Sequence, residues 1–236
     1  MKTLIAACAL VASLPGLPIA QDAARDLSGV WMQKEPAAAL NATTPRMTAL
    51  GEALSRANKP TVGAAASRDS NDPTLACLPA GVPYILTVPV PFEFIQTATR
   101  LVQLFEYNHN VRQLYTDGRS HPSNLQETQQ AQWMGHSTAQ WDDDTLVVDS
   151  VGFNGRTWLD RAGHPHSSEL HLIERIRRVN TTTLQYDVTI DDPKVYVTPW
   201  TTRLEFVLRP GWDILEHNCM PEDEEYRRYK EQAWRP

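Results

Sequence analysis

Strict alternation of apolar and polar side chains is the feature that most constrains how this chain can fold. Residues 184–191 and 204–208 show it most clearly. In the first segment the apolar positions are Leu184, Tyr186, Val188 and Ile190. A period of two places these side chains on one face of a β-strand, whereas a helix would need a period of 3.6. Both segments are therefore predicted to be half-buried strands.

Further short runs of strand character follow one another from residue 26 to residue 219. They are 26–33, 92–97, 101–107, 111–116, 134–142, 145–153, 168–178 and 213–219, separated mostly by tight polar turns. No helix alternates with them, so a parallel sheet is not expected. About nine or ten consecutive antiparallel strands usually close into a barrel or fold into a sandwich, and a closed up-and-down barrel is favoured here. The chain is thus predicted to be mainly β.

Two helices are expected outside the strands. Thr44 can cap a short N-terminal helix that starts at Pro45. Residues 221–234 have acidic residues before basic ones, an order that suits the dipole of a C-terminal helix.

The first twenty residues are typical of a secretory signal. Lys2 precedes an apolar run over residues 4–14, and Pro15 ends that run before it is long enough to span a bilayer. Residues 1–20 are therefore predicted to be a signal peptide and residues 21–236 a single domain, secreted or periplasmic. No other stretch is predicted to span a membrane.

The predicted export affects which state of the cysteines is expected. Cys8 leaves with the signal, and Cys77 and Cys219 remain. Two cysteines in an exported chain most often form a disulfide, and one closing so long a loop stabilises by ~4–5 kcal/mol in the chain-entropy model. The alternative is two buried free thiols.

The net charge and the motifs of the chain limit the kinds of binding partner that are expected. The formal net charge is −6, and no basic stripe with interleaved aromatic residues is present, which argues against nucleic acid. No glycine loop for a dinucleotide or a phosphate occurs, so no cofactor is predicted and the expected partner is a small organic molecule.

Two resemblances support the fold. Gly29-Val30-Trp31 resembles the Gly-x-Trp of lipocalins and other calycin barrels, which implies a tryptophan packed across the closed base of a barrel. The runs FEFIQT, LFEYNH, YTDGRSHP, WDDDTLVVDSVGFN, TWLDRAGHPHS and LHLIERIRR resemble a large family of uncharacterised secreted bacterial β proteins. That resemblance implies an exported β fold and brings no activity with it.

Two carboxylates fall on apolar strand faces. Glu106 shares a face with Val102 and Leu104, and Glu174 shares one with Leu172 and its neighbours. If those faces point inward, both carboxylates are buried, which raises a carboxyl pKa and suits a general acid or base. The alternative is a structural ion pair, with Arg112 or Arg175 as partner.

Histidines gather at turns near these strands. His121 follows a turn, His164 and His166 lie in the loop before the Glu174 strand, and His171 is on that strand. A histidine at a barrel rim can transfer protons near neutral pH. The His164–His166 pair, with His121 or Asp160, is an alternative metal set, but no metal is predicted.

The favoured hypothesis is an enzyme that performs cofactor-independent acid–base chemistry in a pocket at the barrel mouth, of lyase, isomerase, hydratase or hydrolase type. The predicted catalytic residues are Glu106, Glu174 and His166. The predicted substrate-binding residues are Arg112, Tyr115, Asp117, His121, Trp158, Asp160 and His171. The alternatives are a calycin-like carrier of a small apolar ligand and a structural envelope protein.

Overall fold

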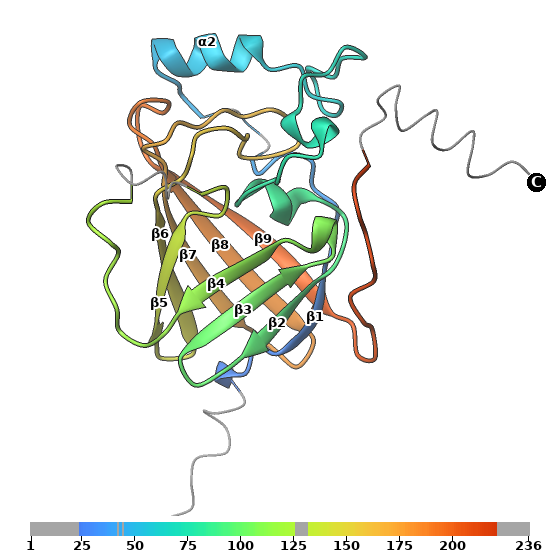
Figure 1. The fold of residues 1–236 in the computed structure, drawn as a ribbon, viewed down its shortest axis with the longest axis vertical. Coiled ribbons are helices and arrows are strands. Elements are labelled where there is room, and N and C mark those ends of the chain that lie inside the picture. The colour runs from blue at the N-terminus through green and yellow to red at the C-terminus, as the bar shows by residue number, and fades with distance from the viewer. Residues whose placement is uncertain (1–23, 42, 44, 126–131, 221–236) are drawn as a thin grey trace, which may run out of the picture.

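The computed structural model describes residues 24–41, 43, 45–125 and 132–220, and its core is a closed barrel of nine strands (Figure 1). The strands are β1 (Gly29–Gln33), β2 (Phe92–Gln96), β3 (Arg100–Phe105), β4 (Val111–Tyr115), β5 (His136–Asp142), β6 (Thr145–Val151), β7 (His171–Arg178), β8 (Thr183–Asp191) and β9 (Trp200–Leu208). Each strand pairs with the next along the chain, and β1 closes the ring on β9. The predicted mainly β barrel is confirmed.

One pair of neighbours is parallel, and the odd number of strands requires it. Strand directions cannot alternate all the way round a ring of nine, so at least one pair must run the same way. That pair is β4 and β5, with Leu114 opposite Ser137 and Tyr115 opposite Thr138. The other eight pairs are antiparallel, as the sequence predicted. A parallel pair needs a long connection, and residues 116–135 supply it.

Side chains fill the barrel interior. Four phenylalanines pack edge-on or tilted against one another at centroid distances of 5.0–5.5 Å around Phe92. Aliphatic and aromatic residues of β6 to β9 complete the core, and those of β8 have no exposed surface. Trp31 is also fully buried; its indole N–H donates to the Leu27 carbonyl at 2.9 Å, and the Arg178 guanidinium lies 5.6 Å from its ring.

The upper end of the barrel in Figure 1 is covered by segment 34–91 and by the loops around residues 152–170. The covering segment contains helix α2 (Ala49–Ala57) and the short 3-10 helices η1 (Pro73–Ala76) and η2 (Tyr84–Thr87); η3 (Tyr107–His109) follows β3. Helix α2 begins later than predicted, because the Thr48 hydroxyl caps it by accepting from the Gly51 N–H at 3.1 Å. Thr44 and the predicted C-terminal helix lie outside the described residues.

Residues 213–219 form no strand, contrary to the prediction, and run as extended chain past the barrel. This segment is tied to the cover by the Cys77–Cys219 disulfide, which joins residues 142 positions apart and confirms the predicted pairing. Within the described ranges, no helix combines the length and apolar character that crossing a bilayer requires.

Candidate functional site

Glu174 points into the barrel, as its strand face predicted, but it is held by an ion pair. Both Glu174 oxygens accept from the Arg112 guanidinium, one of them at 2.9 Å, and the Tyr186 hydroxyl donates to the carboxylate at 2.7 Å. The hydroxyls of Ser137 and Ser150 accept from the same guanidinium at 3.2 and 2.8 Å. Glu174 is 0% exposed and Arg112 2%. This interior network is the structural ion pair that the sequence left as an alternative.

Glu106 does not lie on the inward face of β3, so the expectation that its carboxylate is buried in the barrel is wrong. The inward residues of β3 are Leu101, Gln103 and Phe105, and Glu106 follows the strand at the start of η3. Its carboxylate accepts from the Leu215 backbone N–H at 3.0 Å. Both faces of β3 carry aliphatic residues, and the sequence pattern selected the outer one.

His166 is buried in the cover, where both ring nitrogens have partners. Its Nε2 lies 2.8 Å from the Thr157 hydroxyl, and its Nδ1 lies 2.9 Å from the Ser167 carbonyl. Burial lowers the pKa of His166, which favours the neutral ring. A neutral ring that donates through Nδ1 and accepts through Nε2 satisfies both contacts.

Trp158 and Asp160 belong to the same cover. Trp158 is 5% exposed, and the fully buried Asp160 carboxylate accepts from the Leu40 backbone N–H at 2.9 Å and contacts His164 Nδ1 at 2.6 Å. Five surface cavities among the described residues are all lined by other side chains. The predicted catalytic residues are therefore not gathered in any of these cavities.

A different group of titratable side chains meets on the outer surface of the barrel. We define the outer cluster as His121, His136, Thr138, Asp149 and His171. Antiparallel register places Thr138 of β5 opposite Asp149 of β6, and His171 lies at the start of the neighbouring β7. His121 comes from the connection between β4 and β5. The parallel pairing of those strands thus brings a loop histidine against the outer face.

Asp149 is the centre of the outer cluster. Its Oδ1 lies 2.9 Å from His171 Nε2 and 3.2 Å from His121 Nε2. His121 Nδ1 lies 2.8 Å from His136 Nδ1. An ionised carboxylate only accepts hydrogen bonds, so both Nε2 atoms carry the proton and donate. With its proton on Nε2, His121 can accept at Nδ1 from the Nδ1–H of His136.

His136 is tuned toward the neutral form. Burial is the largest cause of its lowered pKa, followed by the charges of His121 and Arg119. Among the described residues, the Nε2 of His136 has no hydrogen-bond partner. In the neutral ring that nitrogen carries a lone pair and can accept a hydrogen bond.

A cavity of about 250 Å³ adjoins the outer cluster. Asp149 and Thr138 form part of its wall, Val147 and Ile173 give it apolar surface, and Arg119 stands in the loop beside it. The remaining lining residues are Gly118, Ala139 and Gln140. The Asp149 side chain is 44% exposed, and its second oxygen has no hydrogen-bond partner among the described residues.

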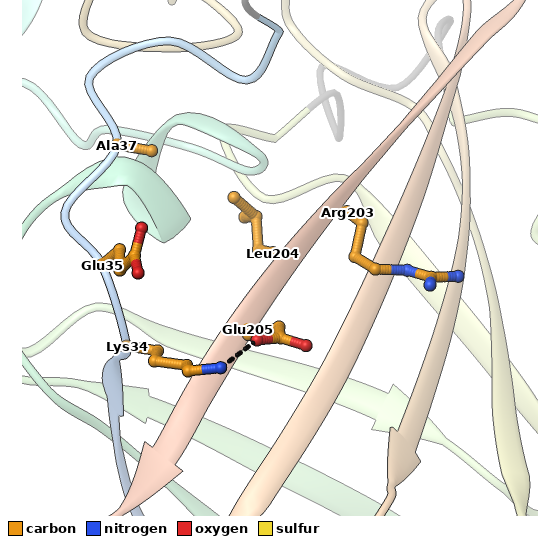
Figure 2. A pocket seen from close by; sticks show the side chains of 6 residues that line it. All are labelled: Lys34, Glu35, Ala37, Arg203, Leu204 and Glu205. Carbon is orange, nitrogen blue, oxygen red and sulfur yellow. Dashed lines mark hydrogen bonds and ion pairs between the residues drawn. The ribbon is translucent and has the colours of Figure 1, made fainter.

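A larger cavity of about 420 Å³ lies where β1 separates from β9 (Figure 2). Lys34 and Glu205 pair across it at 2.7 Å, and the Arg203 guanidinium reaches away to Asp187 at 2.6 Å. No histidine is among the residues that line this cavity, whereas the outer cluster combines three histidines with a carboxylate and is better suited to proton transfer near neutral pH.

Four of the residues predicted to bind substrate lie at or beside the outer cluster. His121 and His171 belong to it, Tyr115 stacks on His136, and Asp117 pairs with Arg119 in the wall of the adjoining cavity. Arg112 lies in the interior, and Trp158 and Asp160 lie in the cover.

His136, Asp149, Thr138 and Arg119 were not among the site residues predicted from the sequence. Asp149 had one usable signal, because it breaks the outward apolar face formed by Val147 and Val151.

No group of three or more His, Cys, Asp or Glu side chains among the described residues is arranged to hold a metal ion. The chain matches no protein-family model, no curated protein and no solved structure. The resemblances seen in the sequence thus stay expectations, and the geometry of the outer cluster carries the functional argument.

Proposed function

We propose that this protein is an exported enzyme that performs acid–base chemistry on a small organic molecule, without a cofactor, at the outer cluster. One observation carries the proposal: a half-exposed carboxylate, Asp149, receives two imidazole N–H groups on one oxygen and lines a cavity. The reaction class stays as broad as lyase, isomerase, hydratase or hydrolase.

Asp149 is the group that would exchange a proton with the substrate. Hydrogen bonds from His121 and His171 fix one carboxylate oxygen, and the other oxygen has no hydrogen-bond partner among the described residues. General acid–base catalysis needs a positioned group within hydrogen-bond reach of the transferred proton. The cavity wall places Asp149 in reach of a bound molecule.

His121 and His136 extend this carboxylate into a relay. With the protons placed as above, the Nδ1–H of His136 donates to His121 and the Nε2–H of His121 donates to Asp149, over 2.8 and 3.2 Å. The relay therefore runs toward Asp149, and it would return a proton to the carboxylate after Asp149 has acted as an acid. When Asp149 acts as a base, the proton that it takes can leave to solvent from its half-exposed side chain.

The size of the cavity limits the substrate. Ligand sites for drug-sized molecules span roughly 300–1,000 Å³, and the cavity beside Asp149 has about 250 Å³. The substrate is therefore a small molecule with an apolar part that contacts Val147 and Ile173.

Export is part of the proposal and is supported by the disulfide. Cys77 and Cys219 pair in the folded chain, and such bonds persist in oxidising compartments. Residues 1–20 would be removed as a signal peptide, leaving the protein secreted or periplasmic.

A structural envelope protein is the second candidate, favoured by the filled interior of the barrel. Core positions such as Leu172, Val188 and Ile190 have no exposed surface, and Glu174 is neutralised by Arg112. A carrier that holds its ligand inside the barrel has less support, because side chains occupy that space.

Generic base-sensitive probes test the proposal. We would incubate residues 21–236 with 5-nitrobenzisoxazole, which opens when a base removes one proton, and with p-nitrophenyl acetate. The expected result is saturable turnover of one probe that falls about 100-fold in Asp149→Asn, within the range for losing a general base.

Asp142→Asn is the matched control. Asp142 also lies on the outer surface of the β5–β6 hairpin, paired with Arg175 at 2.9 Å, and does not line the cavity. Its substitution should leave turnover unchanged. Turnover that survives in Asp149→Asn, or no saturable turnover of either probe by the wild type, would favour the structural candidate instead.

A further inference from the structure

Arg119 stands in the wall of the same cavity, in the loop beside β5. Its guanidinium lies 3.8 Å from the centre of the Tyr115 ring, and that ring stacks on His136 with centroids 5.5 Å apart. An arginine stacked on an aromatic face is held in orientation by the ring. The guanidinium is therefore positioned at the cavity before anything binds.

Only some of the N–H donors of the Arg119 guanidinium are bonded within the protein. Its Nε donates to Asp117 Oδ1 at 2.9 Å, and its Nη2 donates to Asp117 Oδ2 at 2.5 Å. Nη1 donates to no described residue. The side chain of Arg119 is 46% exposed and that of Asp117 is 26% exposed. Ion pairs this accessible to solvent contribute little to stability. A second carboxylate can bind the unused side of Arg119 or displace Asp117 at small cost.

Other residues that line the cavity have the opposite character. Asp149 and Thr138 contribute oxygen atoms, and Val147 and Ile173 contribute apolar side chains. A negatively charged group would be repelled by Asp149 and attracted by Arg119. The cavity thus distinguishes the two ends of a bound molecule.

We infer that the substrate is a small organic carboxylate whose carboxylate binds Arg119, while its apolar body lies on Val147 and Ile173 and its reacting atom faces Asp149. This rests on the proposed function and adds the class of substrate. Arginine suits the role because its planar donors match the two oxygens of a carboxylate. Arg119 would bind and orient the substrate, and Asp117 would hold Arg119 in its absence.

The test uses benzoate, an unreactive carboxylate, with benzamide as its neutral analogue. Binding to residues 21–236 is measured by titration calorimetry and by NMR shifts of the Arg119 side chain. Benzoate should bind at least about 10-fold more tightly than benzamide, since hydrogen bonds to charged groups contribute more than neutral ones. Arg119→Gln should remove that preference.

Asp117→Asn separates binding from a structural role. Removing the competing carboxylate frees Arg119, so benzoate should bind more tightly in this variant, while Arg119→Gln weakens it. If the ion pair only shaped the loop, both variants would weaken benzoate equally. Arg175→Gln is the matched control, because Arg175 is 49% exposed and paired with Asp142 but lies outside the cavity wall.

The inference is overturned if benzoate and benzamide bind equally, if Arg119→Gln leaves benzoate binding unchanged, or if Asp117→Asn weakens it. Failure here is distinguishable from failure of the proposed function. Benzoate binding without any effect of Asp149→Asn on probe turnover would remove the catalytic assignment and keep the carboxylate site. Loss of turnover in Asp149→Asn, together with benzoate binding that does not depend on Arg119, would keep the catalytic assignment and remove the carboxylate site.

Discussion

Two carboxylates on neighbouring strands of this barrel have opposite surroundings. Glu174 of β7 points inward, is 0% exposed, and has partners on both oxygens. Asp149 of β6 points outward, is 44% exposed, and has imidazole partners on one oxygen. The strands alternate, so Ser150 joins the interior network one residue after Asp149, just as Ser137 does one residue after His136.

The comparison distinguishes a carboxylate that stabilises the fold from one that can take part in a reaction. A buried, saturated ion pair exchanges no protons with a substrate, and removing one partner leaves an uncompensated charge. A half-exposed carboxylate with a free oxygen and titratable neighbours can exchange protons and costs the fold little if neutralised. Burial alone, which first pointed to Glu174, marked the structural member of the pair.

The largest effect should come from breaking the interior ion pair. Glu174→Gln leaves the Arg112 charge buried and unpaired, which should lower the free energy of unfolding by about 3–5 kcal/mol. Urea denaturation followed by tryptophan fluorescence measures it. The double variant Arg112→Met/Glu174→Leu should recover most of the loss. A Glu174→Gln protein as stable as wild type would mean that Glu174 is not the structural member.

The second effect concerns the outer carboxylate. Asp149→Asn should reduce probe turnover by about 100-fold, equivalent to about 2.7 kcal/mol of transition-state free energy. Its free energy of unfolding should change by less than about 1 kcal/mol, because the side chain is half-exposed. A destabilisation as large as that of Glu174→Gln would erase the contrast between the two sites.

Stability should fall in acid because of a buried histidine. The pKa of His166 is lowered from 6.5 by burial, so the unfolded chain binds the proton first as pH falls. The stabilising contribution is present above pH 6.5 and is lost as pH drops toward the folded-state pKa, by roughly 1 kcal/mol between pH 7 and 5.5 for a fully buried ring.

The partly buried His136 has a pKa lowered in the same direction and should contribute less than His166, because solvent screens it. Unfolding curves for His166→Gln and His136→Gln between pH 5.5 and 7.5 test this order. A larger loss of pH dependence in His136→Gln than in His166→Gln would reverse it.

The smallest effect should come from Gln103, a neighbour of Arg112 across β3 and β4. Neither polar atom of its buried amide has a partner among the described residues. Gln103→Met should be neutral or stabilise by up to about 1 kcal/mol, since an unsatisfied buried amide is costly. A loss above about 1 kcal/mol by urea denaturation would show that the amide is satisfied in solution.

The fold was largely predictable because strand alternation is local. Leu184 to Ile190 alternate strictly and form β8 as expected. The same rule placed Glu174 inside correctly. It failed at Glu106, because both faces of β3 are apolar and alternation alone could not choose between them.

The outer cluster was only half predictable because it depends on register. His121 and His171 were singled out as histidines near turns. Asp149 acquires its role only when β6 aligns with β7 and the connection from β4 returns along the barrel. Long-range pairing of this kind leaves no signal in a single stretch of sequence.

The most direct test of the outer cluster needs no substrate. Nitrogen-15 NMR of the imidazole side chains at pH 8 reports which ring nitrogens of His121, His136 and His171 carry protons. The geometry predicts protons on Nε2 of His121 and His171, a proton on Nδ1 of His136, and a scalar coupling across the 2.8 Å contact between His121 and His136. A His121 proton on Nδ1 with no donation to Asp149 would contradict the relay and the catalytic role assigned to this site.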